Sequence, residues 1–195
     1  MPAMTSKSVF DKDGAETKMA ARTPADGITR PVHHSEVITL QQTVTRPANV
    51  TAYAAGAAIG AAADVKFTFD IAAAGIPAGL IIAARLVRDQ TTNTSVRFRA
   101  GVHDAVPNTL PAGDGAAAPL LWANRVSRRG WVDFSNPHVG VAAGSNCADY
   151  AGVLSNAQGI PVNPADGKLT LTLGTLDAFV PVSGENYLLE IDMVA

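Results

Sequence analysis

The chain is poor in cysteine, in charged residues and in aromatic residues. It contains one cysteine, Cys147, among 195 residues, which excludes an intramolecular disulfide and fits assembly in a reducing cytoplasm. Charged residues make up 16% of the chain, below the usual quarter, and aromatic residues make up 6%. Much of the surface is therefore small and neutral. Such a surface suits contacts with neighbouring subunits, and it is equally typical of a plain Ala-rich soluble domain.

The chain also has neither a basic surface nor a long apolar run. A net charge of -2 gives no electrostatic case for binding nucleic acid, because phosphate contacts need a basic surface. The longest apolar stretches, residues 52–63 and 71–84, are rich in Ala and Gly and fall short of the roughly 20 apolar residues that a membrane helix needs. Residues 1–21 are interrupted by charges and lack the apolar segment of a signal peptide. We expect no nucleic-acid partner, no membrane partner and no export signal.

Motifs that carry chemistry are absent from the sequence. There is no Gly-x-Ser-x-Gly elbow, no His-Glu-x-x-His, no phosphate-binding Gly-rich loop and no Cys/His cluster of zinc type. His103 and Asp104 fall at a strand end, where capping a turn explains them better than a catalytic triad does. The tract Asp11-Lys12-Asp13-Gly14 begins like a calcium loop but lacks the required later Gly and Glu. We predict no enzymatic activity, no metal and no cofactor.

From Glu36 onward the apolar residues recur with a period of two, which is typical of β-strands. The clearest strand is residues 65–71, where apolar and polar residues alternate as expected for a sheet with one face in water. Further strands are predicted at residues 37–44, 80–87, 96–102, 169–173 and 187–194. Only residues 116–129 favour a helix, which Pro119 confines to a short one. The pattern predicts an all-β fold, an antiparallel β-sandwich of the jelly-roll kind.

Residues 1–34 differ from the rest of the chain. They are rich in Lys, Asp, Thr and Ala and have almost no β-branched apolar residue, so they bury too little surface to offset their ordering entropy alone. We predict an extended N-terminal arm over residues 1–34, followed by a β-sandwich domain over residues 35–195. The arm is either disordered in the isolated protein or ordered by a neighbouring subunit, and both alternatives stay open.

Four tracts carry a resemblance to a known family. The first begins with Thr45-Arg46-Pro47 and continues through Thr51-Ala52-Tyr53 into a Gly-rich stretch. The second runs from Leu86-Val87-Arg88-Asp89 through Val96-Arg97-Phe98-Arg99 and ends in His103-Asp104-Ala105-Val106-Pro107. The third joins Asp114-Gly115-Ala116-Ala117 to Gly130-Trp131-Val132-Asp133-Phe134. The fourth is the turn Ser183-Gly184-Glu185-Asn186-Tyr187 after an apolar-Pro segment. In this order they resemble a family of tailed-bacteriophage structural proteins. The Ala-rich insert at residues 54–63 and the irregular region 135–164 depart from that family's pattern.

The resemblance implies a structural role in a phage particle. The most specific expectation is a head decoration (cement) protein, made and assembled in the host cytoplasm, which binds the outer capsid lattice of the virion. Its partners would be the major capsid protein and copies of itself, as a homo-oligomer such as a trimer. Interfacial area repeated over many copies would then strengthen the head. The alternative is a tail-associated or fibre-associated receptor-binding or glycan-binding module, with exposed aromatic residues around a groove.

The sequence also offers a candidate protein interface, made of arginine and large aromatic residues. The residues that we predict for it are Arg46, Tyr53, Trp122, Arg125, Arg128, Arg129 and Trp131. The last three arginines form the only basic cluster, which would pair with an acidic patch on a partner or lie in a solvated loop. Trp131 shares a strand face with Asp133 and is predicted to lie in the core or an interface. Under the alternative function, Trp131 and Tyr150 would stack on sugar rings together with Trp122 and Tyr53.

Overall fold

The computed structural model describes residues 4–10, 16–22, 30–31, 37–62, 64–76, 78–92, 95–118, 122–139 and 147–194. The chain divides into two compact units, residues 1–36 and 37–195. In the first unit, β1 (Met4–Phe10), β2 (Glu16–Arg22) and β3 (Arg30–Pro31) form an antiparallel sheet in the order β1-β2-β3. The sequence predicted an extended arm here, and the pairing of these strands with one another was not foreseen.

The second unit is built from one antiparallel sheet of eleven strands. The strands are β4 (Val37–Thr45), β5 (Ala58–Ile59), β6 (Lys66–Asp70), β7 (Gly79–Arg88), β8 (Phe98–His103), β9 (Arg128–Phe134), β10 (His138–Val139), β11 (Ala148–Leu154), β12 (Ile160–Val162), β13 (Lys168–Thr175) and β14 (Asn186–Val194). Their order is β4-β14-β7-β11-β9-β8-β13-β5, with β10 beside β11, β12 beside β7 and β6 beside β13. The described residues include no α-helix, and none of their helices could span a membrane.

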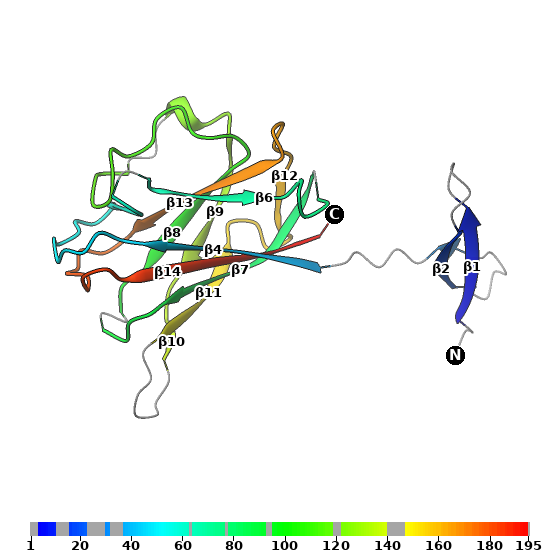
Figure 1. Ribbon diagram of the computed structural model, residues 1–195, viewed down its shortest axis with the longest axis horizontal. Coiled ribbons are helices and arrows are strands. Elements are labelled where there is room, and N and C mark those ends of the chain that lie inside the picture. Colours follow the sequence, from blue (N-terminus) through cyan, green and yellow to red (C-terminus); the bar gives the residue numbers. More distant parts are fainter. Residues whose placement is uncertain are drawn as a thin grey trace. The chain divides into compact units, whose positions relative to one another are not determined.

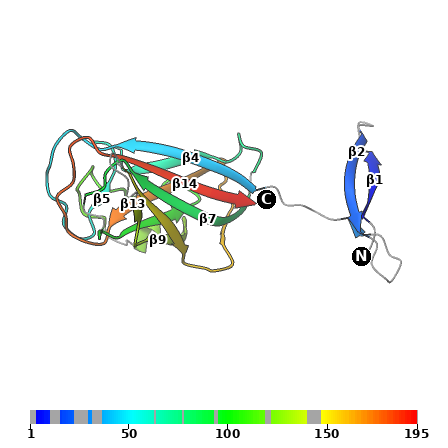
Figure 2. The same cartoon turned by 90° about the horizontal axis from the view of Figure 1, so that it is seen from below.

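The sheet curls on itself, so that β4, β14 and β7 face β9, β8 and β13 across a common core (Figures 1 and 2). Its edge strands β4 and β6 come into contact, and the Gln42 side-chain oxygen accepts a hydrogen bond from the Thr68 backbone N–H. This antiparallel, jelly-roll-like β-sandwich confirms the predicted fold class.

The period-two pattern is the reason why these segments form strands. Along β14, every second side chain is buried, from Tyr187 to Met193, and the residues between them face outward. The same alternation buries Phe67 and Phe69 in β6. An aromatic cluster fills the middle of the core, where the Phe98 ring lies edge-on to the ring of Tyr150, 5.4 Å away between centroids.

Two local predictions were wrong. The region 135–164, described above as irregular, contains β10, β11 and β12. The helix predicted within residues 116–129 is reduced, in the described part, to a single 3₁₀ turn at Trp122–Asn124, and β9 already begins at Arg128. Residues 119–121, where that helix was expected to begin, lie outside the described residues.

Strand β11 joins the two halves of the sandwich. Residues 148–151 pair with β7, and residues 152–154 pair with β9. The crossover falls at Gly152, where an added Cβ would lie 2.5 Å from Val132 Cγ1 and 2.9 Å from the carbonyl oxygen of Ala84. Only glycine allows the two layers to approach so closely at this point.

We therefore expect Gly152→Ala to lower the free energy of unfolding by about 2 kcal/mol, because the added methyl group forces strands apart in a packed core. Gly174→Ala is the matched control, since its Cβ would meet nothing closer than the Ala57 carbonyl oxygen at 3.4 Å. Urea denaturation of both variants measures the difference. Equal losses in the two variants would contradict a special packing role for Gly152.

Candidate functional site

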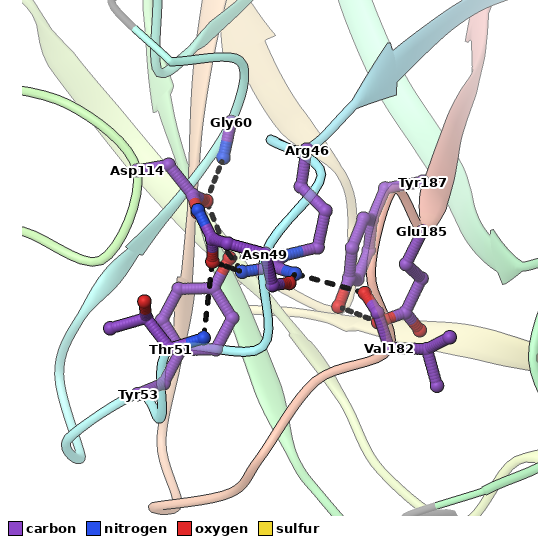
Figure 3. Close-up of polar contacts among 9 residues, drawn as sticks. All are labelled: Arg46, Asn49, Thr51, Tyr53, Gly60, Asp114, Val182, Glu185 and Tyr187. Atoms are coloured by element: carbon purple, nitrogen blue, oxygen red, sulfur yellow. Dashed lines mark hydrogen bonds and ion pairs between the residues drawn. The ribbon is translucent and has the colours of Figure 1, made fainter.

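The side chain of Arg46, just after β4, turns into the protein and is 2% exposed. Its Nη1 atom donates to the carbonyl oxygens of Asn49, at 2.5 Å, and Val182, at 2.9 Å. Its Nε atom donates to the Tyr53 hydroxyl at 3.1 Å, and its Nη2 atom lies 3.4 Å from Asp114 Oδ2 (Figure 3). One buried guanidinium therefore holds together three separate loops.

Tyr53 and Asp114 complete this arrangement. The Tyr53 hydroxyl donates to the Asp114 carboxylate, which also accepts the Gly60 backbone N–H at 3.1 Å (Figure 3). Burial and the hydrogen bond to Asp114 raise the pKa of Tyr53, so the phenol stays protonated at every physiological pH. The Asp114 carboxylate thus accepts bonds from a charged, a phenolic and a backbone donor.

A second charged pair, Arg88 and Glu185, lies deeper in the same end of the sandwich. Both side chains are 0% exposed, and Arg88 Nη2 lies 2.5 Å from Glu185 Oε1. The Tyr187 hydroxyl donates to the other Glu185 oxygen at 3.0 Å, and Arg88 Nη1 donates to the Tyr150 hydroxyl at 3.2 Å. The guanidinium also lies 5.4 Å from the centre of the Phe98 ring, within cation–π range.

The residues that carried the family resemblance supply most of these contacts. Arg46 and Tyr53 come from the first tract, Asp114 from the third, and Glu185 and Tyr187 from the fourth. Figure 3 shows the five side chains gathered at one end of the sandwich. These tracts therefore contribute side chains to the protein interior. We call the set made of Arg46, Tyr53, Arg88, Asp114, Glu185 and Tyr187 the buried polar network.

The outer face of β9, β8 and β13 carries a groove of about 430 Å³. Its floor includes Trp131, Gly101, His103 and Thr172, and part of its wall is the loop of residues 107–118. That wall is largely apolar, since it consists mostly of Ala, Pro and Leu side chains. The volume is within the range of small-ligand sites.

His103 is a buried titratable group at this groove. Burial, followed by the charge of Arg128, lowers the pKa of His103 from 6.5 to about 4. Its Nδ1 atom lies 3.4 Å from Ser127 Oγ. The neighbouring Asp104 forms an ion pair with Arg129, so the two residues at this strand end have different partners.

The structure places the predicted interface residues in three different settings. Arg46 and Tyr53 are buried in the polar network, where neither can reach a partner without unfolding, and this is the correction to their assignment. Tyr150 is also buried, so neither it nor Tyr53 can stack on a sugar. Trp122 opens the 3₁₀ turn, and its side chain lies outside the described part.

The remaining predicted residues are at least partly at the surface. Arg125 and Arg129 are exposed and Arg128 is half-buried. Trp131 is 42% exposed, so its assignment to the core was wrong, and an interface role stays a prediction. Its indole packs against the Arg99 guanidinium, which is 5.4 Å from the ring centre and is fixed by Asp133.

Sequence reasoning did not name Gly101 or Thr172 as site residues, and it placed Arg88 in the second tract of the resemblance without giving it a role. Nothing in the local pattern around Arg88 distinguishes a buried arginine from a surface one in a strand. Gly101 and Thr172 belong to the groove only because strand pairing places them beside Trp131 and His103.

Comparisons with known proteins give no identity. No protein-family model matches the chain, and no curated protein matches it significantly. A solved structure described as "nora virus structure" is 9% identical, with 97% of this chain and 71% of that chain covered and a TM-score of 0.21. A likeness at this TM-score carries no argument, and the phage resemblance stays a prediction.

Glu185→Gln removes the negative partner of a fully buried arginine. We expect it to lower the free energy of unfolding by about 3 kcal/mol, because the Arg88 charge is then left uncompensated in the core. Asp177→Asn is the control, since it breaks an ion pair with the exposed Arg97 and should cost about 1 kcal/mol or less. Denaturant unfolding at pH 7 measures both variants, and a smaller loss for Glu185→Gln than for the control would contradict the role of the buried pair.

The His103 pKa of about 4 predicts a pH-dependent stability. Because the folded state disfavours the charged imidazole, this contribution is complete above pH 6.5 and is lost as the pH falls toward 4. We expect a decrease of the order of 2 kcal/mol across that window, since solvent in the groove weakens the effect of burial.

The matched variant is His103→Gln. Its unfolding free energy should depend less steeply on pH between 6.5 and 4.5, because the variant lacks the buried imidazole. Parallel pH profiles for the two proteins would show that His103 carries no such linkage.

Proposed function

We propose that this chain is a structural protein of a tailed-phage particle, specifically a decoration or cement protein that binds the outer capsid lattice. The observation that carries the proposal is the buried polar network. Tracts that resemble phage structural proteins meet in it, so the resemblance falls on buried residues that form the interior contacts of the fold.

The composition supports the same role. A surface low in charge and rich in small residues loses little hydration when it is covered by neighbours, which suits a protein that acts through buried area. The exposed arginines that lead into β9 and the exposed Trp131 are the residue types favoured at interface centres. The major capsid protein and further copies of this chain, in a homo-oligomer such as a trimer, are the proposed partners.

One observation favours the second candidate, a receptor-binding or glycan-binding module of the tail or fibre. Trp131 is exposed on the floor of a groove, where a sugar ring could stack on it. The two candidates differ in copy number and in location in the particle.

The test is quantitative mass spectrometry of virions separated into heads and tails. We expect hundreds of copies in the head fraction, in a fixed ratio to the major capsid protein. A handful of copies confined to the tail fraction would overturn the decoration role in favour of the second candidate.

Purified protein added to heads that lack it gives an independent readout. Arg125→Glu with Arg129→Glu should reduce head binding at least tenfold, whereas Arg97→Glu, on a separate exposed pair, should leave it unchanged. Equal binding by all variants would remove the basic cluster from the proposed interface.

A further inference from the structure

The positive charge of the groove favours an anionic ligand. Its described lining contains Arg99, Arg128 and His103 and includes no carboxylate. Arg99 is already bound to Asp133, but Arg128 has no ion-pair partner among the described residues. The positive charge of Arg128 acts on groove residues, since it is one cause of the lowered pKa of His103. An anionic ligand would supply the missing partner.

The floor of the groove has a flat apolar element, the Trp131 indole, beside a glycine. Gly101 in β8 lies directly between Trp131 in β9 and Thr172 in β13 in the strand register. Since adjacent strands are about 4.8 Å apart, Trp131 and Thr172 are roughly 10 Å apart across the floor. The indole is held in place by Arg99 and is 42% exposed.

Two polar atoms lie close over Gly101. A Cβ built on Gly101 would lie 3.0 Å from Thr172 Oγ1 and 3.1 Å from His103 Nε2. The Thr172 and His103 side chains therefore fill the space directly above Gly101, and their polar atoms lie near each other in the groove lining, where one ligand hydroxyl group could contact both. Since His103 Nδ1 is turned toward Ser127, the Nε2 atom is left to face the groove.

This combination fits a sugar better than a peptide. The floor strands β9, β8 and β13 have partners on both sides, so their backbone groups are taken up by the sheet and no edge is available for strand addition. Recognition must come from side chains. A pyranose ring has one apolar face for an indole and hydroxyl groups at its edge for Thr172 and His103.

We propose that the groove over Gly101 binds an acidic glycan, with a sugar ring stacked on Trp131, a hydroxyl group bound by Thr172 and His103, and a carboxylate paired with Arg128. This site does not depend on the proposed decoration role. It would operate on a head surface or on a tail.

The experiment is calorimetric titration of the full chain with oligomers of galacturonic, glucuronic, mannuronic and sialic acid. A neutral galactose oligomer and poly-L-glutamate are titrated in parallel. We expect at least one acidic oligomer to bind more tightly than the neutral one, with an affinity that falls as salt is raised. Failure of all four acidic oligomers to bind would overturn the proposal. Tighter binding of poly-L-glutamate would also overturn it, in favour of an acidic peptide.

Single substitutions test the individual contacts proposed between the groove and the glycan. Trp131→Ala should weaken acidic-glycan binding at least tenfold, and Trp131→Phe should restore most of it. Arg128→Gln should abolish the preference for acidic over neutral oligomers, whereas Arg85→Gln, outside the groove, should not change it. Thermal denaturation checks that each variant is folded. Binding that is unchanged in both Trp131→Ala and Arg128→Gln would contradict the site.

Head binding of Trp131→Ala separates this inference from the proposed function. Loss of glycan binding with normal head binding supports the glycan site. Loss of head binding in a protein that binds no glycan would assign the groove to the capsid contact, which would overturn the glycan site while the decoration role stands.

Discussion

The interior of the sandwich depends on two arginines that are fully removed from water. Moving a guanidinium into a protein core costs several kcal/mol, and this cost is offset only when the carboxylate and the remaining acceptors are all in place. Arg46 needs Asp114, Tyr53 and two carbonyl groups, while Arg88 needs Glu185 and Tyr150. Apart from Asn49 and Tyr53, which lie close to Arg46 in the chain, these partners come from loops and strands far away in sequence. The network is therefore satisfied in one arrangement of these segments, which makes the end of the sandwich specific as well as stable.

The two faces of the β9-β8-β13 layer have different roles because the strand period is two. Inward residues such as Val102 and Leu171 fill the core, and the alternating outward residues form the groove floor. Gly101 is on the outward face, where its missing side chain lets Thr172 Oγ1 and His103 Nε2 lie close together over the strand. At the crossover glycine in β11, Gly152, the space is instead taken up by the Val132 side chain and the Ala84 carbonyl oxygen.

Period-two alternation located most of the strands, because burial on one face imposes it on the sequence. Strand β11 escaped this rule. Burial does alternate along β11, but residue type does not follow it, because the outward-facing Val153 is apolar and the Ala and Gly residues weaken the β signal. The predicted interface failed at Arg46 and Tyr53 for a different reason. Arg46 and Tyr53 are seven positions apart, and nothing in the sequence around them indicates whether such a pair is buried or exposed.

The all-β class and the main strands could be predicted from the amino-acid sequence, since they follow from residue type and from spacing along the chain. The tertiary structure alone decided that Arg46, Asp114 and Glu185 are interior residues. It also decided that Trp131, Gly101 and Thr172 lie in one row across three strands. Both facts depend on strand register and on loops meeting at long sequence separation, which no pattern within a single strand encodes.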